Sequence, residues 1–480
     1  MDLRPGEREF QQRARDVGPD GFVLVGISRM EDGETPISLY RKLLPLGAHY
    51  LLESAGESDG PGRYSIIGLE PREHLIFEKE SSPFEGLEAS LRRYRVSIPE
   101  GFPPFVGGAV GYITFEAARY IEGDLLFAPS PWPDGEFSIA GTYAILDHFT
   151  HTLHLLTLAP ATAEGYARGK ARLLEVQQAI REGDGFLPEV PLPEEEPPSG
   201  SSFPRAAFLA AVRRAQEAMA RGEVLQVVLA QKLRRGLLGH PFDIYRALRS
   251  LNPSPYLFYL DFGPRILAGS SPETLLKVEG RRLIHRPIAG TRPRGETKAD
   301  DEALLEELLK DPKEASEHAM LVDLGRDDLS RVCRPGTVRI VEERAVEKYS
   351  RVMHLVTELQ GELAEGLSPL QALKSVFPAG TLTGAPRRKA LEAILSLEPE
   401  ARGPYGGVVG YVGFNGQMDM AIAIRMVALR EGRAEIGAGA GVVQGSVPER
   451  EYQETMDKAR AVEEALQMAR ILSPVGGVGR

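Results

Sequence analysis

The chain has 480 residues, and its 57 Lys and Arg against 68 Asp and Glu give a formal net charge of −11. This acidic balance excludes a general nucleic-acid binder or anionic-membrane binder, because neutralising phosphates requires a basic face. The single cysteine, Cys333, excludes a disulfide framework and any zinc or iron–sulfur site that needs several thiolates.

The N-terminal segment, residues 1–16, lacks the apolar stretch of a secretory signal. No uncharged apolar run elsewhere reaches the ~18 residues that span a membrane. Together with the single cysteine, these features predict a cytoplasmic protein that is neither secreted nor integral to a membrane.

Strand-like and helical patterns fill the first 186 residues. Clusters of apolar and β-branched residues predict strands at 22–27, 64–67, 143–146 and 151–159, and a helical pattern follows at 161–183. The Pro- and Glu-rich segment 187–204 has no apolar period, and its prolines make it a stiff spacer. We therefore predict an N-terminal region, 1–186, a linker, 187–204, and a second region, 205–472.

The second region opens with a predicted helix that begins near Arg205 and ends at Gly222, followed by a strand at 224–235. Further along, Asp311 and Pro312 have the pattern of an N-cap and a first-turn proline, with Glu314 as the capping-box acid. Ser446 and Pro448 repeat this pattern. Two more helices are therefore predicted, at 312–329 and from 448 onwards.

Each of these two helices carries a pair of carboxylates at i, i+3 near its start, Glu314 with Glu317 and Glu451 with Glu454. Such acids can be solvated residues that interact with the helix dipole. If the pairs converge, four carboxylates suit a hard cation such as Mg²⁺. The sequence leaves both readings open. A ferritin-type di-iron site is rejected because it needs Glu-x-x-His, whereas His318 lies four residues after Glu314.

A glycine-rich segment, residues 435–446, precedes the last of these helices. It contains Gly437, Gly439, Gly441 and Gly445, whose exposed backbone N–H groups would suit a carboxylate or phosphate, although a tight turn alone would also use glycine. Val442 occupies the position of the last glycine in GxGxxG, so the segment is not a dinucleotide fingerprint. A second turn is predicted at 380–386.

Three single residues are ambiguous on their own. Arg425 lies in an apolar, strand-like run and needs an anionic partner, either a side chain or a substrate carboxylate. His354 is either an acid/base group or a core histidine, and Glu273 has the same ambiguity.

Eight motifs of the second region occur together in a known order. They are GSSPE (269–273), RPIAGTRPRG (286–295), DPKEASEHAMLVDLGRDDL (311–329), VMHLVTEL (352–359), FPAGTLTGAP (377–386), GPYGGVVGY (403–411), MDMAIAIR (418–425) and GAGAGVVQGSVPEREYQET (437–455). LLES (51–54) and GRYSIIG (62–68) extend the pattern into the first region. The chain resembles the chorismate-utilising enzymes, and within them the component I group of anthranilate synthases.

The resemblance implies an α+β fold with two large, mainly antiparallel β-sheets packed together and helices on the outside. It implies a lyase that binds Mg²⁺ and the ring carboxylate of chorismate, adds a nucleophile to the ring and expels the opposite hydroxyl. The implied catalytic residues are Glu273 as general acid, His354, Thr381 and Gln226. The implied substrate contacts are Tyr405, Arg425, Lys458 and the backbone N–H donors of a glycine-rich turn formed by Gly439, Ala440 and Gly441. The implied Mg²⁺ ligands are Glu317 and Glu454 directly, with Glu314 and Glu451 largely through water.

Two positions distinguish the branches of the family. Members that add water carry a lysine base where this chain has Gln226, and aminodeoxychorismate synthases carry a lysine nucleophile where it has Ala289. The resemblance thus implies amination beside the ring carboxylate, followed by pyruvate elimination to anthranilate, the first step of tryptophan biosynthesis. Alternatives are an aminodeoxyisochorismate synthase that stops before elimination, an aminodeoxychorismate synthase component I, and a catalytically silent tryptophan-binding module.

Amination implies a source of ammonia. The chain lacks the Cys-His-Glu set of a glutamine amidotransferase, so a separate amidotransferase subunit, component II, is expected, in a heterotetramer. The resemblance also implies feedback inhibition by tryptophan bound within the N-terminal region and the NPSPYLFYL segment. The implied regulatory residues are Leu52, Glu53, Ser54, Pro253, Pro255, Tyr256 and Leu257. The chain departs from the family pattern at Asp327, Ser330 and Arg387.

Overall fold

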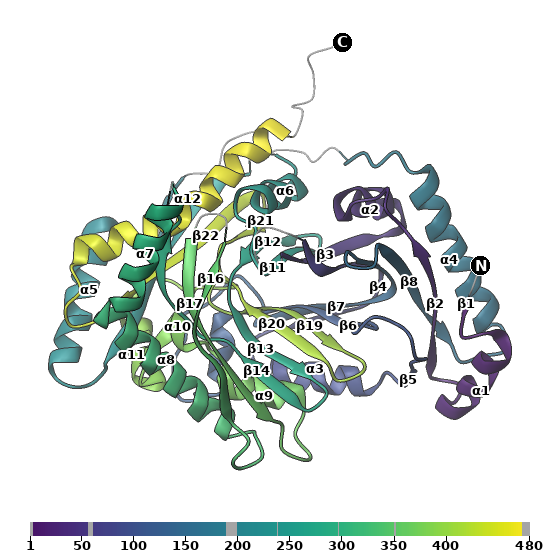
Figure 1. Ribbon diagram of the computed structural model, residues 1–480, viewed down its shortest axis with the longest axis horizontal. Coiled ribbons are helices and arrows are strands. Elements are labelled where there is room, and N and C mark those ends of the chain that lie inside the picture. The colour runs from purple at the N-terminus through teal and green to yellow at the C-terminus, as the bar shows by residue number, and fades with distance from the viewer. Residues whose placement is uncertain are drawn as a thin grey trace, which may run out of the picture.

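The computed structural model describes residues 3–55, 61–188, 199–237, 239–295, 297–349 and 352–472. Most of the predicted linker, residues 189–198, lies outside them. The described residues fold into an α+β protein (Figure 1). Its α-helices are α1 (Glu7–Val17), α2 (Pro36–Leu43), α3 (Pro83–Arg92), α4 (Gly165–Glu182), α5 (Arg205–Ala220), α6 (Pro241–Leu251), α7 (Lys298–Lys310), α8 (Pro312–Ser330), α9 (Pro369–Val376), α10 (Gly380–Thr383), α11 (Arg387–Leu397) and α12 (Pro448–Leu472).

The strands are β1 (Leu3–Arg4), β2 (Phe22–Met30), β3 (Ala48–Ala55), β4 (Pro61–Phe77), β5 (Val96–Ser97), β6 (Gly108–Ile113), β7 (Gly135–Asp147), β8 (Thr152–Pro160), β9 (Gly200–Ser201), β10 (Gln226–Gly236), β11 (Tyr256–Asp261), β12 (Arg265–Ser271), β13 (Thr274–Glu279), β14 (Arg282–His285), β15 (Ile288–Pro293), β16 (Arg339–Lys348), β17 (Val352–Glu362), β18 (Gly384–Ala385), β19 (Val408–Gly413), β20 (Met418–Ile422), β21 (Met426–Arg430) and β22 (Arg433–Val442). Short 3₁₀ helices lie at Leu44–Leu46 and Phe115–Tyr120.

Strand pairing is almost entirely antiparallel, with β2 and β5 as a parallel pair. One arm runs through β2, β8, β7, β4, β3, β11, β12, β21, β22 and β10. The other runs from β7 through β6, β19, β20, β13, β14, β17 and β16. The resemblance implies two sheets, but hydrogen bonds join the two arms into one network at β7. This strand is long enough to pair with β6 near its start and with β8 near its end.

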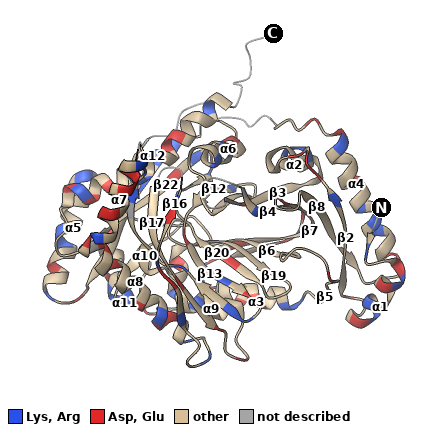
Figure 2. Cartoon of the chain, viewed as in Figure 1, with Lys and Arg blue, Asp and Glu red and all other residues tan. Residues whose placement is uncertain are grey.

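The arms pack against each other through a shared apolar core. Phe258 and Met426 of the first arm lie in one cluster with Tyr112 and Val409 of the second. Two further cores lie beneath helices, one including residues of α6 and α12 and the other residues of α5, α9 and α11. Figure 2 shows charged residues mainly on the outer helices, as burial of the arms' apolar faces requires. The first and second regions are therefore not separate in space, because β3 pairs with β11 and β6 with β19.

Most predicted elements are confirmed. The predicted strands correspond to β2, β4, β7, β8 and β10, and the predicted helices correspond to α4, α5, α8 and α12. Asp311 accepts a hydrogen bond from the Glu314 N–H at 3.3 Å, as an N-cap does. Ser446 does not cap α12: its hydroxyl accepts from the Val443 N–H at 3.0 Å and closes the preceding turn. None of the described helices is long and apolar enough to cross a membrane.

Candidate active site

The candidate site residues meet beside the β10–β22 pair. Gln226 begins β10, and the register places Val228 opposite Gly441 and Ala230 opposite Gly439. Helices α8, α10 and α12 and strand β17 bring most of the other predicted residues to this region, and Glu273, Tyr405 and Arg425 come from the segments between strands or before them. Segments more than 200 residues apart in the chain thus form one site.

The predicted glycine-rich turn is wrong. Gly439, Ala440 and Gly441 are extended residues of β22, which pairs with β21 only as far as Ile436. Beyond Ile436 the second edge of β22 carries no strand among the described residues, so its backbone groups are open to other elements. A Cβ atom on Gly437 would lie 2.1 Å from the Tyr405 ring, which explains a glycine at that position.

Two side chains use this open edge. The Gly439 N–H donates to the Tyr405 hydroxyl, and the Gly439 carbonyl accepts from Lys458 Nζ at 3.0 Å. Burial raises the pKa of Tyr405 to about 12, so its hydroxyl stays protonated. The strand edge therefore holds a neutral donor and a cation side by side, as recognition of a carboxylate requires.

Glu273 is buried between β12 and β13 and accepts a hydrogen bond from Thr381 Oγ1 at 2.9 Å. Its main chain is fixed because the Glu273 carbonyl accepts from the Ile422 N–H at 2.9 Å. Burial raises the pKa of its carboxyl to about 7, against the opposing hydrogen bonds from Thr381 and the Ile288 backbone. A carboxyl with this pKa can donate a proton near neutral pH.

His354, on β17, is buried with 7% of its surface exposed. Burial lowers the pKa of its imidazole to about 4, and the positive charges of Arg425 and Lys458 act in the same direction. The ring also makes a hydrogen bond to the Gly290 backbone. His354 is therefore neutral at physiological pH and has the capacity to accept a proton.

Arg425 was expected inside a strand, and this is wrong. β20 ends at Ile422 and β21 begins at Met426, while Arg425 has a left-handed backbone with φ of 51°. Its Nη1 donates to the Lys458 carbonyl at 3.4 Å. Burial lowers its pKa, and the negative charge of Glu454 opposes that shift. The turn thus places the Arg425 guanidinium against α12, next to the open edge of β22.

The four predicted carboxylates have different partners. Glu317 Oε1 accepts from Gln226 Nε2 at 2.8 Å and lies 3.5 Å from the Cβ position of Gly441. Glu454 pairs with Lys458 at 2.7 Å. Because Lys458 also binds Gly439, Glu317 and Glu454 both lie near the Gly439–Gly441 segment of β22.

Glu314 pairs with Arg292 at 3.2 Å, and Glu451 is buried with 6% of its surface exposed. Within the part of the chain that the structure describes, no three carboxylate, imidazole or thiol groups are close enough to hold a metal together. The donor chemistry nevertheless fits an oxygen-seeking cation, since all four groups are carboxylates and the nearby Gln226 Oε1 is buried without a hydrogen-bond partner.

The predicted regulatory segments are adjacent. β3 pairs with β11, with Glu53 opposite Leu257, and Pro253 and Pro255 lie in the loop before β11. Glu53 is buried and accepts hydrogen bonds from Tyr245 and from Arg249, at 2.9 Å for Arg249 Nε. The Tyr256 hydroxyl instead bonds Asp419 at 2.8 Å, which places it on the opposite face of β11 from Leu257.

Sequence reasoning missed the two α6 partners of Glu53. Tyr245 and Arg249 are four residues apart on one face of that helix, and this spacing was the only available signal.

Sequence reasoning also missed a buried network behind Tyr405. The Arg402 guanidinium pairs with Glu398 at 2.5 Å and donates to the carbonyls of Leu382 and Val228.

Glu116 completes this network from the first region. Its carboxylate accepts from the backbone N–H groups of Arg402 and Gly403, at 2.7 and 3.0 Å, and burial raises its pKa to about 7. The network fixes the chain on both sides of the site, next to Thr381 and before Tyr405. Removing one partner of such a buried pair costs about 3–5 kcal/mol.

Comparisons with known proteins identify the family of the chain. The sequence pattern of the family described as chorismate binding enzyme matches residues 48–464. The chain is 43% identical over 458 residues to anthranilate synthase component 1 of Thermus thermophilus, covering 92% of this chain and 97% of that one. It is 40% identical over 481 residues to the component 1 of Pseudomonas aeruginosa, covering 94% and 97%.

Solved structures give the same result. Anthranilate synthase component I from Streptococcus pneumoniae superposes with a TM-score of 0.74 at 32% identity, covering 84% of this chain and 92% of that one. The menaquinone-specific isochorismate synthase of Escherichia coli has a TM-score of 0.73 at 19% identity, covering 95% and 99%, and shows a shared fold.

Proposed function

The chain belongs to the chorismate binding enzyme family as an anthranilate synthase component I, a lyase that aminates chorismate to anthranilate, and from this premise we propose a role in binding or catalysis for each site residue. The observation that carries the proposal is the buried Glu273 carboxyl, with a pKa of about 7 and a hydrogen bond from Thr381. Its proton goes to the ring hydroxyl as the C–O bond breaks, and water leaves.

Gln226 directs the choice of nucleophile. Its neutral amide donates to Glu317 and cannot remove a proton from water at physiological pH. Ammonia needs no base to expose its lone pair, so the ring is aminated rather than hydroxylated.

The carboxyl groups of chorismate are held by Arg425, Tyr405, Lys458 and the Gly439 to Gly441 strand edge. Charge-assisted and bidentate hydrogen bonds suit this role.

His354 acts in the second step. Elimination of pyruvate makes the ring aromatic and removes a ring proton. A neutral imidazole with a pKa of about 4 is unprotonated at pH 8 and available as the proton acceptor, although such a low pKa makes it a weak base.

Mg²⁺ is the proposed cofactor. Glu317 and Glu454 would hold it directly, and Glu314 and Glu451 largely through water. When bound, the ion would neutralise the ring carboxylate of chorismate. Lys458 and Arg292, which pair with Glu454 and Glu314, balance the negative charge of these groups in its absence.

Component II, a glutamine amidotransferase, is the proposed source of ammonia. The purified chain with chorismate and Mg²⁺ should form anthranilate when ammonium chloride is added near pH 8.5. It should form none with glutamine until component II is added. Anthranilate fluorescence measures both. Formation of anthranilate from glutamine by the chain alone would contradict the proposal that component II supplies the ammonia.

Tryptophan is the proposed feedback inhibitor, with its ammonium group at Glu53. Glu53→Gln removes the charge, so the tryptophan concentration that halves each variant's own uninhibited rate should rise at least about tenfold. Arg249, which is 38% exposed, can be hydrated when its partner loses the charge. Glu100→Gln, at an exposed position, is the matched control. Equal sensitivity of the two variants would place the ligand elsewhere.

A further inference from the structure

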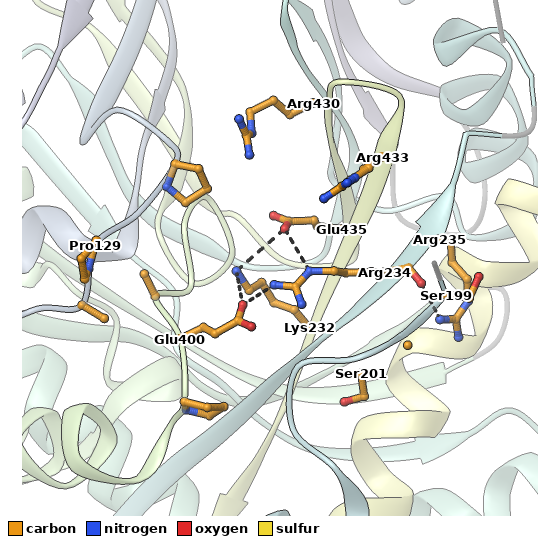
Figure 3. Close-up of a pocket in the computed structure, with 15 residues that line it drawn as sticks. Pro129, Ser199, Ser201, Lys232, Arg234, Arg235, Glu400, Arg430, Arg433 and Glu435 are labelled. Atoms are coloured by element: carbon orange, nitrogen blue, oxygen red, sulfur yellow. Dashed lines mark hydrogen bonds and ion pairs between the residues drawn. The ribbon is translucent and has the colours of Figure 1, made fainter. Parts of the chain in front are cut away.

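A cavity of about 570 Å³ lies at the end of the β10–β22 pair opposite to the candidate active site (Figure 3). The register places Arg234 opposite Glu435 at this end and Val228 opposite Gly441 at the other. The loop around Pro129, residues 199–201 and residues 399–401 form the other walls. Its volume lies within the range of small-molecule sites, and none of its described lining residues belongs to the active site.

The lining is strongly basic, although the whole chain is acidic. Five cations line the cavity against two carboxylates, those of Glu400 and Glu435. The cations are Lys232, Arg234, Arg235, Arg430 and Arg433. A concave surface that concentrates positive charge attracts small anions.

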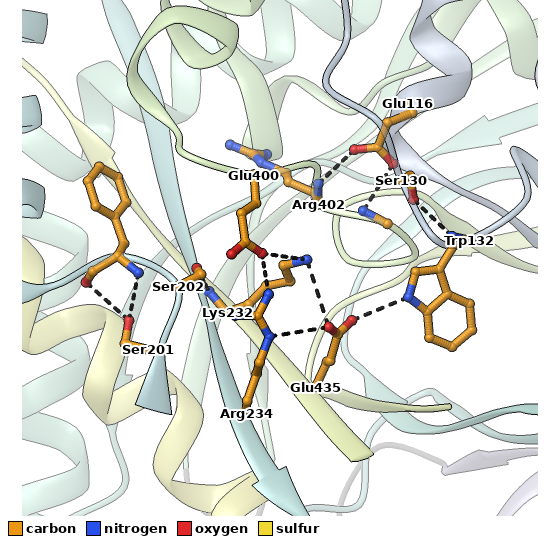
Figure 4. Close-up of polar contacts among 12 residues, drawn as sticks. Glu116, Ser130, Trp132, Ser201, Ser202, Lys232, Arg234, Glu400, Arg402 and Glu435 are labelled. Atoms are coloured by element: carbon orange, nitrogen blue, oxygen red, sulfur yellow. Dashed lines mark hydrogen bonds and ion pairs between the residues drawn. The ribbon is translucent and has the colours of Figure 1, made fainter. Parts of the chain in front are cut away.

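The two carboxylates are already neutralised within the wall (Figure 4). Glu400 pairs with Arg234 and, at 3.4 Å, with Lys232 Nζ. Glu435 accepts from Trp132 Nε1 at 3.2 Å and lies 3.6 Å from Arg234 Nε. Lys232 and Arg234 therefore have anionic partners inside the protein.

The β21–β22 hairpin adds cations that the wall does not neutralise. Arg430 lies directly opposite Arg433, and Arg265 directly opposite Arg430. Like charges in directly opposed positions destabilise a sheet. Arg265 is compensated by Glu136 at 2.7 Å. Among the described residues, the ion pair of Arg430 is with Glu431, a 67% exposed neighbour, at 2.7 Å.

Arg433 makes no hydrogen bond or ion pair through its side chain within the described ranges. Arg433 and Glu435, two residues apart on one strand, share a face of the sheet, and Figure 3 places Arg430 and Arg433 together on the cavity rim. A bound anion would relieve the repulsion between the two guanidinium groups.

We propose that this cavity binds a small dianion, through carboxylate or phosphoryl oxygens, held by the guanidinium groups of Arg430 and Arg433. Guanidinium groups match both oxyanions by paired N–H donors. The site is separate from the chorismate site and does not depend on its assignment.

The fluorescence of Trp132 can report ligand binding in the cavity, because Trp132 is the only tryptophan of the chain and its indole N–H donates to Glu435 in the cavity wall. The purified chain is titrated with inorganic phosphate and, separately, with succinate, at constant ionic strength. Tryptophan fluorescence and titration calorimetry follow binding. We expect at least one probe to bind with a dissociation constant of about 1 mM or below.

The test variant is Arg430→Gln/Arg433→Gln, and the matched control is Arg15→Gln/Arg339→Gln, which removes the same charge from exposed positions. The test variant should bind at least about tenfold more weakly and the control as wild type does. Binding of one probe alone identifies phosphoryl or carboxylate as the ligand group. Absence of wild-type binding by either method up to about 20 mM, or equal binding by the test variant, would overturn the proposal.

Discussion

Replacing Glu273 with Gln is expected to lower kcat for anthranilate formation by roughly 100- to 10,000-fold, the usual contribution of a general acid. Gln has nearly the same shape and can still accept the Thr381 hydrogen bond, but its amide has no acidic proton to transfer to the leaving hydroxyl. Glu342→Gln, at an exposed position on β16, is the control and should keep the wild-type rate. A Glu273→Gln variant with more than a tenth of wild-type activity would exclude Glu273 as the acid.

The pH dependence of this effect has a definite sign. Glu273 acts when protonated, so kcat/KM corrected for free ammonia should fall as pH rises through about 7 in the wild type. The residual activity of Glu273→Gln should lack that step. Burial raises the pKa of Glu273, so between pH 4.5 and about 7 the folded chain keeps a proton that the unfolded chain has lost. The free energy of unfolding therefore decreases as the pH rises through this range. The variant should therefore unfold no more readily than wild type at pH 8.

Replacing Glu454 with Gln is expected to lower Mg²⁺-dependent activity by at least about 100-fold. The substitution removes the charge of a proposed direct ligand and replaces the ion pair with Lys458 by, at most, a neutral hydrogen bond. Titration calorimetry with Mg²⁺ in the presence of chorismate should show a matching loss of affinity.

Glu449→Gln is the control for this variant, because Glu449 lies in the first turn of the same helix and is 49% exposed. It removes one charge near the helix start without touching the open edge of β22. Equal Mg²⁺ affinity of the two variants would remove Glu454 from the metal site.

The helix starts and the long strands could be predicted because their signals are local. Asp311 and Pro312 determine where α8 begins through capping and a fixed φ, and α5 ends near the predicted Gly222. The prediction of a turn in the glycine-rich segment was wrong for the opposite reason, because its signal is not local. Its glycines serve contacts with Tyr405 and Lys458, which come from other parts of the chain, and leave β22 extended.

The candidate site residues themselves could be identified from motifs, but their pairings could not. Nothing local links Gln226 to Glu317, 91 residues apart, or Glu116 to the backbone of Arg402, 286 residues apart. The left-handed turn at Arg425 was also hidden, because an arginine there looks like any residue of an apolar strand. Tertiary contacts decide these features, and a single sequence does not encode them in any short pattern.

The most direct test of the account is the stoichiometry of the reaction. Chorismate, ammonium chloride and Mg²⁺ are mixed with the purified chain, and chorismate, anthranilate and pyruvate are measured chromatographically over time. The account predicts that anthranilate and pyruvate each appear in equal amounts to the chorismate consumed, with no isochorismate. Accumulation of an aminated ring compound without pyruvate, or of isochorismate, would contradict it.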